Sequence, residues 1–175
     1  MRVRPTLFLS CLLLPLLAAS RSAPVGPPLT DAGILAIFDQ VNGFDIETAR
    51  LGVIHGQSET VRSLAADVLR DHSMVQQMAR DVASHAMIAY RVPTGDESGR
   101  AHAAAMKELA GLSGAAFDAA YLKHEIGFHD SAIHAVREVL LPAATSPELK
   151  TLLNTVLPGF EHHLEMTREA ARQVR

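Results

Sequence analysis

Apolar residues recur every three or four positions along most of this sequence, which is the spacing of one face of an α-helix. Four long segments show the pattern, at residues 30–56, 58–92, 113–142 and 146–175, and a shorter one covers residues 101–112. Alternation of apolar and polar residues, which is typical of strands, is rare. The pattern therefore predicts an all-α fold. In the first segment the stripe expected to face the core is Ile34, Ile37, Phe38, Val41, Phe44, Thr48 and Leu51.

Residues with known helix-end preferences stand at the boundaries of these segments. Thr30, Ser58 and Ser146 are suited to cap helix N-termini, because a side-chain oxygen can accept a hydrogen bond from a free backbone N–H. Pro147 follows Ser146 at the first helical position, which proline favours. Pro142 is expected to end the third long helix, because proline removes a backbone donor.

The lengths of the connections favour one bundle topology. The links between the first and second long helices and between the third and fourth are short, so each pair should form an antiparallel hairpin. The link between the second and third is long and contains the short helix. Two hairpins joined by one long crossover are typical of a ferritin-like four-helix bundle.

The N-terminal segment has the layout of a secretory signal. A basic start with Arg2 and Arg4 precedes an apolar run, and small residues follow up to Ser20. We therefore expect a signal peptide at residues 1–20, a proline-rich flexible leader at 21–29 and the bundle domain at 30–175. The predicted location is extracytoplasmic, in the periplasm or cell envelope. The one cysteine, Cys11, lies inside the apolar run, so disulfides and thiolate metal sites are excluded for the mature chain.

Composition narrows the set of partners. The formal net charge is −3 and no cluster of Lys and Arg is present, so binding to nucleic acid is not expected. After signal cleavage no apolar run is long enough to span a membrane. The remaining candidate partners are a metal ion, a second copy of the chain and another protein of the envelope.

Candidate metal ligands lie on or beside the predicted apolar stripes. The chain has nine histidines, and three of them occupy such positions, together with two glutamates. With a helical rise of about 1.5 Å per residue, the five fall within about 9 Å along the bundle axis. Imidazole and carboxylate groups bind divalent and copper-type ions. The residues expected to bind a metal are Glu47, His72, Glu125, His129 and His163.

The same residues also fit a core without metal. A histidine on an apolar stripe is often a core residue that hydrogen-bonds a carboxylate or a carbonyl group. Met74 and Met78 are one helical turn apart and are suited to copper(I), although methionine at this spacing more often fills a core. No serine-hydrolase, nucleotide-binding or zinc-protease motif is present, so no catalytic residue and no organic cofactor is predicted.

Several short motifs are spread over the predicted helices: Glu47, Asp71-His72, Gly114, Phe117-Asp118, Tyr121, His129, Leu157-Pro158 and His163-Leu164. Together they resemble a family of bacterial proteins of unknown function, often labelled "predicted outer membrane protein". The resemblance covers nearly all of the mature chain. It implies a ferritin-like bundle exported to the cell envelope, and it implies no activity.

The sequence departs from ferritins that hold two iron ions. Those sites use Glu-x-x-His on two helices, but the positions three residues before the candidate histidines hold Leu69, Ile126 and Phe160. A single His-rich site of the zinc or copper type fits better. The leading hypothesis is a non-enzymatic exported bundle that binds a metal or serves in envelope stress. The alternatives are a structural or interaction module without metal, and a metal-dependent enzyme.

Overall fold

The computed structural model describes residues 29–90 and 97–174, and all regular structure in these residues is helical. The prediction of an all-α fold is therefore confirmed. The helices are α1 (Asp31–His55), α2 (Glu59–His85), α3 (Glu97–Ala110), α4 (Gly114–Ala135), a π-helical turn η1 (Val136–Leu140), α5 (Leu141–Ala143) and α6 (Pro147–Gln173).

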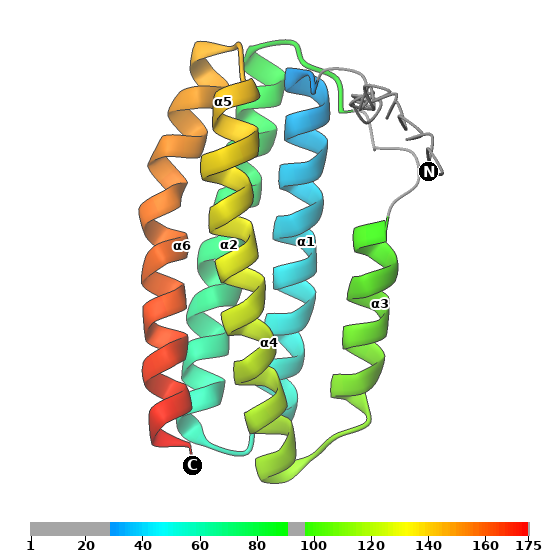
Figure 1. Ribbon diagram of the computed structural model, residues 1–175, viewed down its shortest axis with the longest axis vertical. Coiled ribbons are helices and arrows are strands. Elements are labelled where there is room, and N and C mark those ends of the chain that lie inside the picture. The colour runs from blue at the N-terminus through cyan, green and yellow to red at the C-terminus, as the bar shows by residue number, and fades with distance from the viewer. Residues whose placement is uncertain (1–28, 91–96, 175) are drawn as a thin grey trace, which may run out of the picture.

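Four long helices, α1, α2, α4 and α6, stand side by side, and the short α3 lies against the outside of α1 (Figure 1). Helices α1 and α2 form one antiparallel hairpin, and α4 and α6 form another. Between the hairpins, α3 returns the chain to the end of the bundle where α4 begins. All four long helices therefore pass through the middle of the molecule, where each can contribute side chains to a common interior.

The helix ends follow the predicted caps. Thr30, Ser58 and Ser146 each accept a hydrogen bond from a backbone N–H three residues later, at 3.2 Å in every case. Three boundaries differ clearly from the prediction. Helix α2 ends at His85, well before the predicted limit at residue 92. Helix α3 begins four residues before the predicted residue 101, and the helix expected to stop at Pro142 continues through η1 and α5 to Ala143. Pro142 is tolerated there because it lies in the first turn of α5.

Two aspartates link the hairpins through hydrogen bonds to the turns. Asp118 of α4 accepts hydrogen bonds from the backbone N–H groups of Gln57 and Ser58, in the turn between α1 and α2. At the other end, Asp31 of α1 accepts from the N–H groups of Thr145 and Ser146, just before α6. Each turn therefore has its free N–H groups satisfied by the opposite hairpin, which fixes how the hairpins sit relative to each other.

The apolar core consists of two clusters, one toward each end of the bundle. One contains Ile34, Phe38, Leu149 and Phe160, and the other contains Ala49, Val61, Phe117, Tyr121 and Ala170. On each long helix a short polar stretch separates the two clusters. The bundle therefore has a buried polar layer between two apolar layers, and this layer contains the candidate site.

The predicted signal peptide and nearly all of the predicted leader fall on residues 1–28, outside the described part of the chain. Among the described residues, no helix combines the length and the apolar character needed to cross a membrane.

Candidate metal centre

The polar layer is made of six buried side chains from the four long helices. Each has at most 3% of its surface exposed, so the group is isolated from solvent. Helical spacing turns each residue inward, because it continues the apolar face of its own helix. The six are Asn42 and Asp45 from α1, His72 from α2, Glu125 and His129 from α4, and His163 from α6.

The ring orientation of His72 is set by Asn42. The Nδ2 group of Asn42 donates to the carbonyl oxygen of Phe38 at 2.7 Å, so its Oδ1 atom is the one that faces the imidazole. This oxygen lies 3.0 Å from His72 Nδ1 and can only accept. His72 therefore carries its hydrogen on Nδ1, and in the neutral ring Nε2 has a free lone pair. Phe160 stacks on the ring, with 5.0 Å between centroids.

The other two histidines are held in the same way. His129 Nδ1 donates to the backbone carbonyl oxygen of Glu125 at 3.0 Å. His163 Nε2 donates to Oδ2 of Asp71 at 3.1 Å. Burial opposes ionisation of the Asp71 carboxyl, but hydrogen bonds from Arg70 and His163 outweigh it and lower the pKa. The lone pairs are therefore on His129 Nε2 and His163 Nδ1. Fixing the outer nitrogen in this way is what metal-binding histidines almost always show.

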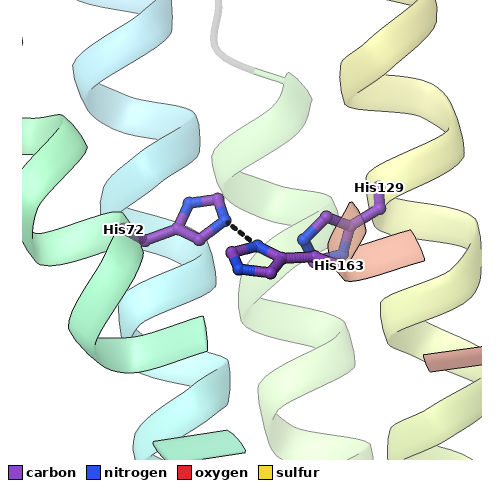
Figure 2. Close-up of side chains that lie close together, drawn as sticks. All are labelled: His72, His129 and His163. Carbon is purple, nitrogen blue, oxygen red and sulfur yellow. Dashed lines mark hydrogen bonds between the residues drawn. The ribbon is translucent and has the colours of Figure 1, made fainter. Parts of the chain in front are cut away.

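The three free nitrogens point to one place. Figure 2 shows the rings of His72, His129 and His163 converging from three helices. His72 Nε2 and His163 Nδ1 are only 3.2 Å apart, and one atom from each ring lies within 4.8 Å of the others. A hydrogen bond across the 3.2 Å gap would need a second proton on one ring. Burial opposes this, because it lowers the pKa of all three rings, that of His129 to about 4.

Two carboxylates face the same point without a hydrogen-bond donor. Asp45 Oδ2 lies 3.1 Å from His72 Nε2 and 3.4 Å from His129 Nε2, the two atoms that carry lone pairs. No other described residue donates a hydrogen bond to the Asp45 or Glu125 carboxyl group, and Glu125 in its protonated form can donate to Asp45. Burial raises the pKa of Asp45 to about 7 and that of Glu125 well above its usual value, which Asp45 raises further.

The cluster forms one site. Asp45, Glu125 and His129 can also bring one atom each within 4.8 Å, but His129 has only one free nitrogen, because its Nδ1 atom donates to the backbone. The donor set is therefore three imidazole nitrogens and Asp45, with Glu125 at the edge, where its Oε2 atom lies 3.7 Å from His129 Nδ1. Three imidazoles and a carboxylate suit zinc, copper(II) and similar divalent ions.

Four of the five predicted ligands meet in this cluster: His72, Glu125, His129 and His163. The fifth, Glu47, does not. Its side chain is 58% exposed and its Oε2 atom pairs with His102 Nε2 at 2.9 Å. Glu47 faces away from the interior because it lies about 200° around the helix from Asp45, at 100° per residue.

Asp45 was missed because the buried face of α1 is polar in its middle. The predicted stripe followed Val41, Phe44 and Leu51, which are only partly buried. The buried face instead continues from Phe38 through two polar residues to the core. Helical spacing is compatible with this face, but its two polar positions resemble a solvent-exposed surface in the sequence. The buried residues are Phe38, Asn42, Asp45, Ala49 and Gly52.

A comparison with models of known protein families found a match over most of the chain. A family model described as "Domain of unknown function (DUF4142)" matches residues 16–170. The chain belongs to this family. A comparison with curated proteins gave no match.

A solved structure resembles the chain in fold. It is described as the crystal structure of a DUF305 fragment from Deinococcus radiodurans, and it superposes with a TM-score of 0.72 at 19% identity. The match covers 84% of this chain and 99% of that one. At this identity the likeness concerns the fold alone.

Proposed function

We propose that this protein is an exported, ferritin-like helical bundle that binds one divalent metal ion in its interior. The ligands are His72 Nε2, His129 Nε2, His163 Nδ1 and the carboxylate of Asp45. Glu125 serves as an additional donor or as the partner that holds a proton when the site is empty. Zinc and copper(II) are the ions that this donor set suits best.

One observation carries the proposal. Each imidazole gives its N–H to a separate acceptor on the outside of the cluster, so three lone pairs and a buried carboxylate face one another. Buried groups that can only accept repel each other unless a cation or protons lie between them. A bound cation satisfies all four donors at once.

The surroundings favour holding a metal over catalysis. Metal-binding sites with a catalytic role keep an open coordination position. Here the polar layer lies between two apolar clusters, with all six of its residues at most 3% exposed. The function that fits this enclosure is retention of a metal ion in the cell envelope, for storage or for protection during stress.

The topology and the N-terminus supply the remaining parts of the proposal. Two antiparallel hairpins with α3 in the crossover support a ferritin-like class. Export is inferred from the basic and apolar segments of residues 1–20. It is tested by expressing the chain in a bacterium and sequencing the N-terminus of the protein recovered from the periplasm. Recovery of the uncleaved chain from the cytoplasm would contradict export.

Metal binding is tested on the untagged protein by mass spectrometry of bound metal, as purified and after incubation with zinc or copper(II). The matched variant is His72→Ala/His129→Ala. Near-stoichiometric metal in the wild type that is lost in the variant supports the proposal. A wild-type protein that takes up neither ion overturns it, and the polar layer is then a hydrogen-bonded network without metal.

A further inference from the structure

The candidate metal centre is enclosed, so an ion can reach it only through a part of the bundle that opens. The groups that hold the three histidines from outside differ in their exposure. Two of them are buried: Asn42, which is 1% exposed, and the backbone of Glu125, a residue that is fully buried. The third is Asp71, which holds His163 and whose side chain is 32% exposed. His163 is therefore in direct contact with a group that reaches solvent.

The contact between His163 and Asp71 crosses from one helix to another. Asp71 lies on α2 and His163 on α6, and these two helices stand side by side (Figure 1). His163 Nε2 donates to Asp71 Oδ2 at 3.1 Å. On the inner side of the same ring, Nδ1 lies 3.2 Å from His72 Nε2, inside the cluster. One imidazole ring therefore connects the α2–α6 surface to the metal centre.

A second carboxylate lies beside this connection. Asp67 is one helical turn before Asp71 on α2, and its side chain is 40% exposed. Burial lowers the pKa of His163, whereas the charges of Asp71 and Asp67 act in the opposite direction, so both carboxylates are close enough to act on the ring. Asp67 also lines a cavity of about 440 Å³ between α2 and α6, together with His162 and Glu165 of α6. A hydrated cation therefore has both room and a negative charge at this point of the surface.

Arg70 pairs with both of these carboxylates. Its Nη1 atom lies 2.6 Å from Asp67 Oδ1, and its Nε atom lies 2.8 Å from Asp71 Oδ1. The Arg70 side chain is 59% exposed, and exposed ion pairs of this kind contribute little stability. A divalent cation carries twice the charge of the guanidinium group, so it can displace Arg70 from the two carboxylates.

We infer that metal ions enter and leave the core centre between α2 and α6, passing from Asp67 to Asp71 and then to His163, and that they displace Arg70 on the way. The inference rests on the proposed metal centre and adds its route of access. Asp67 and Arg70 are not ligands of the centre, so they change the barrier to entry but not the stability of the loaded site. Because Kd is the ratio of the release and association rate constants, both constants should then change by the same factor.

The test uses the full-length protein and cobalt(II), whose visible absorption bands change when imidazole and carboxylate groups coordinate it. Stopped-flow absorption gives the association rate constant, a chase with excess zinc gives the release rate constant, and equilibrium titration gives Kd. Asp67→Asn is expected to slow association and release about 10-fold each, with an unchanged Kd. Arg70→Gln is expected to speed both by a similar factor, because no guanidinium then has to be displaced.

Two control variants remove the same charge elsewhere. Asp130→Asn changes an exposed aspartate of α4. Glu47→Gln changes the exposed glutamate that pairs with His102 of α3, and it weakens the attachment of α3 to α1. Both controls are expected to keep the wild-type rate constants.

Three results would overturn the route. One is wild-type rate constants in both Asp67→Asn and Arg70→Gln. Another is equal slowing in Asp67→Asn and Asp130→Asn, which would indicate a general attraction of cations to the protein. The third is a change of rate in Glu47→Gln as large as that in Asp67→Asn, which would place the entrance beneath α3. A wild type that binds neither cobalt(II) nor zinc would instead refute the metal centre itself, and the route with it.

Discussion

Asp45→Asn should make the metal-free protein more stable at pH 8, although it removes a proposed ligand. Burial raises the pKa of Asp45 from 3.8 to about 7. In the unfolded chain the carboxyl ionises near its ordinary pKa, so folding must either take up a proton or bury a charge. Asparagine has nearly the same shape and does not titrate, so the variant avoids this cost.

The sign and size of the stability change follow from the pKa of Asp45 in the folded and in the unfolded chain. A raised carboxyl pKa means that the folded state binds more protons, so stability falls as pH rises from about 4 to about 7. At 1.36 kcal/mol per pH unit, the wild type loses about 4 kcal/mol of folding stability in total across this pH range. About 1.6 kcal/mol of it is already present at pH 5, so the stability advantage of the variant should grow by at most about 3 kcal/mol between pH 5 and pH 8.

The assay is urea unfolding with EDTA at both pH values, for the wild type, Asp45→Asn and the control Asp130→Asn. Asp130 is exposed on α4 and faces Arg168 at 3.4 Å, so its replacement should have the same small effect at both pH values. With saturating zinc the wild type should be more stable than Asp45→Asn, because only the wild type keeps the carboxylate ligand. A metal-free Asp45→Asn protein that is less stable than the wild type at pH 8 would refute this prediction. A stability advantage that does not change with pH would refute it as well.

Three further predictions concern the metal and the packing. Zinc at about 100 times its Kd should stabilise the protein by about 2.7 kcal/mol, or about 5–10 °C in Tm, and EDTA should reverse the effect. The same Tm shift, measured by calorimetry, in a variant that lacks two of the histidines would contradict this prediction. Asp71→Ala should weaken zinc binding about 10- to 100-fold by freeing His163, whereas Asp67→Ala should not, as measured by chelator competition. Gly52→Ala should lower the free energy of unfolding by about 1–3 kcal/mol, because the added Cβ would lie 2.6 Å from Ala65 and 2.7 Å from a buried tyrosine ring. The control Gly127→Ala places its Cβ in open space on α4, and it should raise the free energy of unfolding by about 0.4–1 kcal/mol in the same assay.

The helices were predictable because their signals are local. The caps at Thr30, Ser58 and Ser146 act on N–H groups three residues away, and the sequence displays both partners. The start of α3 was less predictable. Its first turn has no apolar stripe, so the pattern located the helix only from residue 101 onward.

The histidines of the candidate site were predictable for a related reason. His72, His129 and His163 each continue an apolar stripe on their own helix, and residues at that spacing share the face of the helix that enters the core. On α1 the same logic failed. The buried face there passes through Asn42 and Asp45, and polar residues at these positions resemble a solvent-exposed surface until a partner helix covers them.

The sequence alone determined the helical class, the helix ends and the histidines that face inward, because each depends on residues within a few turns of one another. The tertiary structure decided which carboxylate joins those histidines and which ring nitrogens are free. Asp45 faces the cluster and Glu47 faces away because of how α1 is rotated against α2 and α4. The free nitrogens are set by acceptors that packing supplies, and for two of the histidines these are distant in sequence: Asn42 for His72 and Asp71 for His163. Such choices depend on contacts across helices, which no local pattern encodes.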